Sequence, residues 1–103
     1  MSGRILQINL KFKMARTEFE TALAPLADEL AKVPGLRWKI WLMNEAEKEA
    51  GGIYLFEDQA SLNTYLDGPL VAPVAENPDI SDISMKQFDV LDGVTAITRG
   101  PVQ

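Results

Sequence analysis

The chain has 103 residues, no cysteine, no histidine and a formal net charge of −5 at pH 7. This length fits one domain, residues 1–103, which can bury a core without a disulfide or metal. Without Cys or His, a zinc site, a His- or Cys-ligated haem and a Ser-His-Asp or Cys-His nucleophile are excluded. The acidic balance argues against nucleic-acid binding, which needs a basic surface. We therefore expect neither a metal nor a nucleic-acid partner.

The apolar residues are too dispersed for a membrane protein. No apolar run approaches the roughly 20 residues of a membrane-spanning helix. The first residues, Met1-Ser-Gly-Arg-Ile-Leu-Gln, lack the apolar core of a secretory signal. We expect a cytoplasmic protein with no membrane partner.

The first predicted elements are a strand and a helix. Apolar and polar residues alternate from Leu6 to Met14, which is typical of a strand with one apolar face. Thr17-Glu18-Phe19-Glu20 is a capping-box pattern and predicts a helix start. An apolar stripe then follows at helical spacing: Phe19, Leu23, Leu26, Leu30 and Val33. Pro25 should kink this helix, and Pro34-Gly35 should end it.

Two aromatic-rich segments come next, joined by a short acidic loop. They contain Arg37-Trp38-Lys39-Ile40-Trp41 and Gly51-Gly52-Ile53-Tyr54-Leu55-Phe56. Aromatic and β-branched residues favour strands, so we predict an antiparallel hairpin of residues 36–43 and 50–56. Gly51-Gly52 precedes a strand and not a helix, so it indicates a bulge or a close backbone approach rather than a phosphate site.

The remaining elements complete a familiar order. Asp58 can cap a second helix whose buried residues would be Ala60, Leu62, Tyr65 and Leu66. Gly68-Pro69 should end it, and residues 70–82 are predicted to be irregular because three prolines punctuate this region. A last strand is predicted near residues 83–91. The tail, residues 92–103, is left unassigned.

The predicted order is strand, helix, strand, strand, helix, strand. This is the order of the ferredoxin-like βαββαβ unit, an α+β fold with a four-stranded antiparallel sheet. The core of this unit would span about residues 5–91. We assign Leu6, Ile8, Leu10, Phe12, Trp38, Ile40, Leu42, Ile53, Leu55, Phe88 and Val90 to the face that the helices cover. The opposite face then carries Trp41, Met43, Tyr54, Phe56 and Met85. Such an apolar patch predicts a homodimer that pairs two sheets.

Several segments resemble those of the YdhR-type monooxygenase family. They are Pro34-Gly35-Leu36-Arg37-Trp38-Lys39-Ile40-Trp41, Glu49-Ala50-Gly51-Gly52-Ile53-Tyr54-Leu55-Phe56, Tyr65-Leu66 and Lys86-Gln87-Phe88-Asp89-Val90. The resemblance runs from about Ile5 to Val90. It implies a dimeric α+β barrel and kinship with small monooxygenases that oxidise aromatic, polyketide-like molecules with dioxygen and no bound cofactor. Haem-degrading members of the wider superfamily ligate iron through a histidine, which this chain lacks.

The two tryptophans are the first candidate site residues. Trp38 and Trp41 are three apart on one strand, so their side chains point to opposite faces. Each is interpreted either as a packing anchor or as a platform for a flat aromatic substrate. Which face carries the pocket is left open. On the helix side, Trp38 and Tyr65 would line it, with residues 70–82 at the entrance.

The polar candidates are Asn9, Arg37, Tyr54 and Tyr65. Asn9 is unusual in mid-strand; it is either solvated at a rim or bound to a substrate oxygen. Arg37 and Lys39 share a face with Trp41 and could stabilise a substrate anion, or they are solvated or paired charges. Tyr54 and Tyr65 could relay a proton, or they bond only locally. No catalytic residue is assigned.

Three functions remain open at this point. The first is a cofactor-independent monooxygenase acting on an electron-rich aromatic or enolisable small molecule. The second is a non-catalytic dimeric small-molecule-binding or interaction module of the same fold, because fold alone does not decide function. The third is a cofactor-free isomerase, whose base would be a carboxylate, lysine or tyrosinate. An empty aromatic-lined pocket would favour the first or third.

Overall fold

The computed structural model describes residues 3–102. Its sheet contains four antiparallel strands in the order β2-β3-β1-β4. These strands are β1 (Arg4–Phe12), β2 (Leu36–Asn44), β3 (Glu49–Phe56) and β4 (Ile80–Asp89). Two main helices, α1 (Arg16–Leu30) and α2 (Gln59–Leu66), connect them in the order β1-α1-β2-β3-α2-β4, with the short α3 (Ala72–Glu76) between α2 and β4. The ferredoxin-like α+β fold expected from the sequence is confirmed.

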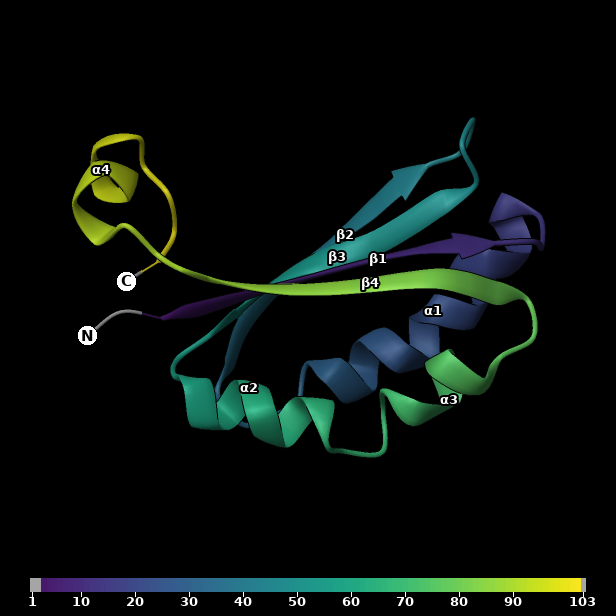
Figure 1. Ribbon diagram of the computed structural model, residues 1–103, viewed down its shortest axis with the longest axis horizontal. Coiled ribbons are helices and arrows are strands. Elements are labelled where there is room, and N and C mark those ends of the chain that lie inside the picture. The colour runs from purple at the N-terminus through teal and green to yellow at the C-terminus, as the bar shows by residue number, and fades with distance from the viewer. Residues whose placement is uncertain (1–2, 103) are drawn as a thin grey trace.

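The helices form a layer on one side of the sheet. Figure 1 shows α1, α2 and α3 beneath it and the C-terminal α4 (Asp92–Ile97) apart from them, near the two chain ends. The core lies between the sheet and this layer. The rings of Phe12 and Phe19 stack at 4.7 Å and join β1 to α1. Tyr54, Phe56 and Tyr65 form a second aromatic group that joins β3 to α2.

The helix starts follow different rules. Ala15 is the N-cap of α1 and no side chain caps it, so the predicted capping box at Thr17 is wrong: Thr17 lies inside the helix. In α2 the predicted cap is confirmed, because the Ser61 N–H donates to Asp58 Oδ1 at 2.8 Å. Residues 70–82 are not irregular throughout. They hold α3, whose Pro73 sits in its first turn, where a missing N–H does no harm.

The register of the sheet corrects the predicted faces of β2, β3 and β4. Leu6 pairs with Tyr54, and Tyr54 pairs with Lys39. Side chains paired across strands share a face, so Tyr54 lies on the buried side of β1, with the helices. The homodimer face predicted from the sequence is therefore wrong in its residues. All five belong to the helix-covered side: Trp41, Met43, Tyr54, Phe56 and Met85.

The opposite face, which we call the outer face, carries the residues that were expected under the helices. These residues are Trp38, Ile40, Leu42, Ile53, Leu55 and Phe88, and Ile5, which had no predicted face, lies with them. Leu55 is fully buried there, and its partner Trp38 donates from Nε1 to the Pro101 carbonyl at 2.8 Å. Ile40 and Phe88 remain 51% and 45% exposed. The outer face is thus apolar but only partly covered by this chain.

Candidate functional site

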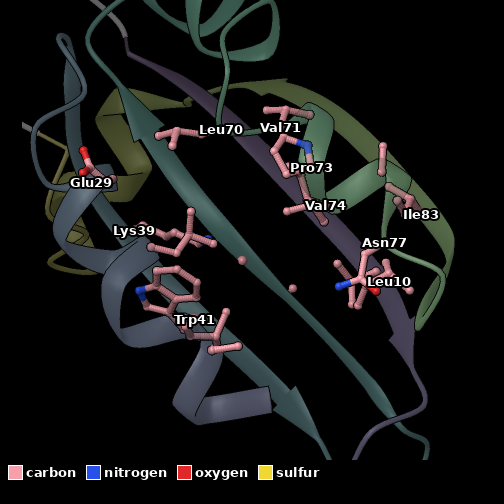
Figure 2. Close-up of a pocket in the computed structure, with 18 of the residues that line it drawn as sticks. Leu10, Glu29, Lys39, Trp41, Leu70, Val71, Pro73, Val74, Asn77 and Ile83 are labelled. Carbon is pink, nitrogen blue, oxygen red and sulfur yellow. The ribbon is translucent and has the colours of Figure 1, made fainter. Parts of the chain in front are cut away.

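A cavity of about 420 Å³ lies between the sheet and the helix layer. Figure 2 shows Lys39 and Trp41 of β2 on one side of it, Val71, Pro73 and Val74 on the other, and Leu70 above Lys39. Most of the remaining apolar wall comes from side chains of the sheet and the helices: Ile8, Leu10, Leu23, Leu26, Tyr54, Tyr65, Ile83 and Met85. A concave, mostly apolar space with a few polar groups is the usual form of a small-molecule site.

Lys39 supplies the only Lys or Arg side chain among the described residues that line this cavity. Its Nζ lies 3.3 Å from the centroid of the Trp41 ring and 4.4 Å from that of Tyr54. Burial lowers the pKa of Lys39 to about 7, because an apolar environment disfavours the charged ammonium. At neutral pH the cavity therefore holds an amine that is poised between its charged and neutral forms.

Two tyrosines form a hydroxyl pair in the same wall. The Tyr65 hydroxyl donates to the Tyr54 hydroxyl oxygen at 3.3 Å, and both residues are buried. Burial raises the pKa of Tyr54 and of Tyr65, so both stay neutral at physiological pH. Because Tyr54 accepts the proton of Tyr65, its own O–H can donate to a ligand oxygen.

Three of the six candidate site residues line the cavity: Trp41, Tyr54 and Tyr65. Trp38 was predicted to line the helix-side cavity, but its side chain lies on the outer face of the sheet. Trp41 lines the cavity instead. The two tryptophans do point to opposite faces, as their spacing indicated.

The other two candidates lie elsewhere. Asn9 is on the outer face, where it accepts a hydrogen bond from Gln7 at 3.0 Å and donates to Glu49 at 3.4 Å. Arg37 is exposed at the register shift between Leu36 and Trp38. This irregularity breaks the alternation that would have put Arg37 beside Trp41. A role for Asn9, Arg37 or Trp38 in this cavity has no geometric support.

Sequence reasoning gave too little weight to Lys39 and to the third helix. Lys39 alternates like a solvent-facing strand residue, but its expected solvation or ion pairing is wrong. A usable signal was Gly52: a Cβ there would lie 2.5 Å from Lys39 Cε, so the glycine provides room for the lysine side chain. Helix α3, which forms part of the cavity wall, was not predicted because its segment contains prolines, which usually indicate irregular structure.

The site is suited to binding and to proton transfer. It combines an apolar cavity, a titrating amine and a neutral phenol donor. Among residues 3–102 there is no cluster of three or more Asp, Glu, His or Cys side chains that could hold a metal ion. No helix in the same range is long and apolar enough to cross a membrane. The expected cytoplasmic location stays a prediction.

Comparison with known proteins places the chain in a family. The family model described as "Putative mono-oxygenase ydhR" matches residues 5–101. This match covers nearly the whole chain, so the protein belongs to that family. Among curated proteins, none matches.

Solved structures with the same fold include proteins with different activities. A Nitrosomonas europaea protein of unknown function, NE2512, is 23% identical, with a TM-score of 0.67 over 88% of this chain and 91% of that one. SnoaB, a cofactor-independent oxygenase from Streptomyces nogalater, is 19% identical, with a TM-score of 0.69 over 85% and 92%. The haem-degrader MhuD from Mycobacterium tuberculosis is 22% identical, with a TM-score of 0.65 over 84% and 95%. At these identities the likeness establishes the fold alone.

Proposed function

We propose that this protein is a cofactor-independent monooxygenase that oxidises an electron-rich aromatic or enolisable small molecule with dioxygen. The observation that carries the proposal is the apolar cavity in which the Lys39 amine faces the Trp41 and Tyr54 rings. Membership of the monooxygenase family supports it. So does the fold shared with SnoaB, which is itself described as a cofactor-independent oxygenase.

The residues suggest how the substrate would be activated. A flat phenol or enol would enter against Trp41, and the neutral Lys39 amine would take its acidic proton. The resulting ammonium would then pair with the substrate anion inside the apolar cavity, where charge interactions are strong. The Tyr54 hydroxyl would donate to a second substrate oxygen.

The electron-rich anion would then react with dioxygen itself. For a methylene that becomes a carbonyl, one oxygen atom enters the product and the other leaves as water with the two hydrogens of the methylene. This balance needs no external reductant. The part of the protein is to deprotonate, orient and shield the substrate.

The test is oxygen consumption against a panel of quinols and polyphenols, with the rate without protein subtracted because such compounds oxidise spontaneously. We expect a protein-dependent rate that falls at least about tenfold in Lys39→Met, since a positioned base typically contributes 10²–10⁴-fold. Lys32→Met is the matched control, because Lys32 is exposed after α1 and does not line the cavity, and it should leave the rate unchanged. No protein-dependent rate with any compound, or equal rates in the two variants, would refute the proposal.

Binding without oxygen uptake would instead favour the non-catalytic small-molecule-binding module. The same panel distinguishes the two, because ligand binding is read by fluorescence and turnover by oxygen consumption. Formation of an isomer without oxygen uptake would favour the isomerase.

Assembly as a homodimer is part of the proposal, and its support comes from the outer face. Ile40 and Phe88 are half-exposed beside Ile5, Leu42 and Ile53, and an exposed apolar face of this kind marks an interface. Two copies of this chain would pair their outer faces and leave each helix-side cavity on the outside of the pair. A stable interface of this type buries about 2,000 Å² or more in total.

A further inference from the structure

Lys39 is a partly buried lysine, and no carboxylate among residues 3–102 pairs with it. The ion pairs among residues 3–102 join Arg4 to Asp89, and Arg16 to Glu20 and Glu45, so no carboxylate of these residues lies within 4 Å of Lys39 Nζ. Its close neighbours are the π faces of Trp41 and Tyr54. A lysine that only stabilised the fold would be expected to pair with an acid or to extend into water.

The position of this amine is built by a neighbouring glycine. Gly52 of β3 pairs with Trp41 of β2, next to Lys39. A Cβ at Gly52 would lie 2.5 Å from Lys39 Cε and 3.4 Å from its Nζ. Any larger residue would push the lysine side chain out of its present path. The absence of a side chain at Gly52 therefore leaves the space in which the Lys39 side chain reaches the cavity wall.

The surroundings of Lys39 favour its nucleophilic form. The titratable groups that share the cavity with it are Glu29 of α1, Tyr54 of β3 and Tyr65 of α2, and of these Glu29 is exposed. Burial lowers the pKa of Lys39 to about 7, so about half of the molecules carry a neutral amine at pH 7. An ordinary lysine with a pKa near 10.4 is neutral in roughly one molecule in a few thousand at that pH. Desolvated lysines in apolar pockets are the ones that form Schiff bases.

We propose that Lys39 forms a covalent imine with hydrophobic aldehydes or ketones that enter the cavity. The Nζ lone pair adds to the carbonyl carbon, and the carbonyl oxygen takes up a proton to give a carbinolamine. Loss of that oxygen as water then leaves the carbon–nitrogen double bond. The Tyr54 O–H can supply a proton to the departing oxygen, because its oxygen accepts from Tyr65. This reaction uses neither oxidant nor reductant, so it is independent of the monooxygenase proposal.

The direct test is reductive trapping of the full chain. The protein is incubated at pH 7 with 2-naphthaldehyde and sodium cyanoborohydride, and intact mass should rise by the aldehyde mass less one oxygen atom. Peptide mapping then compares Lys39 with the other five lysines of the same molecule: Lys11, Lys13, Lys32, Lys48 and Lys86. We expect at least a tenfold preference for Lys39, a small part of its roughly thousand-fold advantage in neutral amine. Labelling that spreads over the other lysines without this preference would overturn the proposal.

A pair of glycine variants tests the geometry. Gly52→Ala keeps the amine but displaces it, so the preference for Lys39 should fall at least fivefold. Gly93→Ala is the control, because a Cβ there has no atom within 4 Å, and it should label like the wild type. An unchanged preference in a folded Gly52→Ala protein would contradict the proposal, as would an equal loss in both variants. Oxygen uptake is measured separately without aldehyde, so failure of one proposal does not decide the other.

Discussion

The Nζ atom of Lys39 lies 3.3 Å from the centroid of the Trp41 ring, and both side chains belong to the helix-covered face of β2. A cation held over an indole gains about 2 kcal/mol when the pair is shielded from water. This gain offsets only part of the dehydration of the ammonium, since the pKa of Lys39 still falls to about 7. The cavity thus carries an electrostatic cost at Lys39 that a ligand anion could remove.

This cost predicts a pH-dependent stability. In the unfolded chain Lys39 titrates near pH 10.5, and in the folded chain near 7. Between these values the unfolded state binds more protons, so the free energy of unfolding rises with pH in this window. Lys39→Met removes the cost, so this variant should be the more stable protein near pH 7. Its advantage should shrink by about 2–4 kcal/mol as the pH approaches about 9.5.

Urea unfolding of the wild type and Lys39→Met at several pH values measures this effect. Lys32→Met, at an exposed position after α1, is the control and should follow the wild type at every pH. The series stays below pH 10, where Tyr54 and Tyr65 would add their own titration, because their pKa values are raised in the folded chain. A stability difference that does not change with pH would show that Lys39 is solvated.

The strand order could be predicted from the sequence, but the faces of the central hairpin could not. β1 alternates cleanly, so its buried side was predicted correctly. β2 carries Trp38 and Ile40 on one face and Trp41 and Met43 on the other. Apolar residues on both faces remove the period-two signal that sets the register. Which face of the hairpin is buried is set instead by the pairing of β3 with β1 and by the register shift at Arg37. No local sequence pattern shows either feature.

The glycine pair on β3 gives the second prediction. A Cβ at Gly51 would lie 1.9 Å from the Ile8 carbonyl oxygen, which is backbone and has no room to move. Gly51→Ala should therefore cost about 3 kcal/mol or more. Gly52→Ala meets the flexible Lys39 side chain and should cost about 1 kcal/mol or less. Equal losses in thermal or urea unfolding would show that the β1–β3 contact is looser than described. The close approach of the Gly51 backbone to the Ile8 carbonyl confirms one of the two interpretations given to Gly51-Gly52 from the sequence.

The outer face gives the third prediction. Ile40 is 51% exposed at the centre of β2, and a buried aspartate without a partner strongly disfavours association. Ile40→Asp should convert a dimer into a monomer in sedimentation experiments at micromolar concentration. Ala60→Asp adds the same charge to exposed α2 on the helix side and should stay dimeric. A wild-type protein that sediments as a monomer would exclude the homodimer.

Only some of the residues that line the candidate site were predicted from the sequence. Trp41, Tyr54 and Tyr65 were recognisable as aromatic residues that need a partner, and they do line the cavity. Lys39 was named only with Arg37 as a possible partner of a substrate anion, because the partial burial of a charged side chain depends on tertiary contacts that no local pattern encodes. The α3 wall was missed for a similar reason: Pro73 breaks a helix interior but suits a first turn.

The two tryptophans give the last prediction, because they report on opposite faces of the sheet. Trp41 lines the cavity, whereas Trp38 donates to the Pro101 carbonyl on the outer face. A flat quinone ligand such as alizarin should quench tryptophan fluorescence saturably in the wild type and in Trp38→Phe, but not in Trp41→Phe. Trp38→Phe should instead lose about 1 kcal/mol of stability with its hydrogen bond and speed amide exchange at Gly100 and Val102, whose N–H groups flank Pro101. If the quenching disappears with Trp38 and survives the loss of Trp41, the ligand binds on the outer face and the helix-side cavity is not the site.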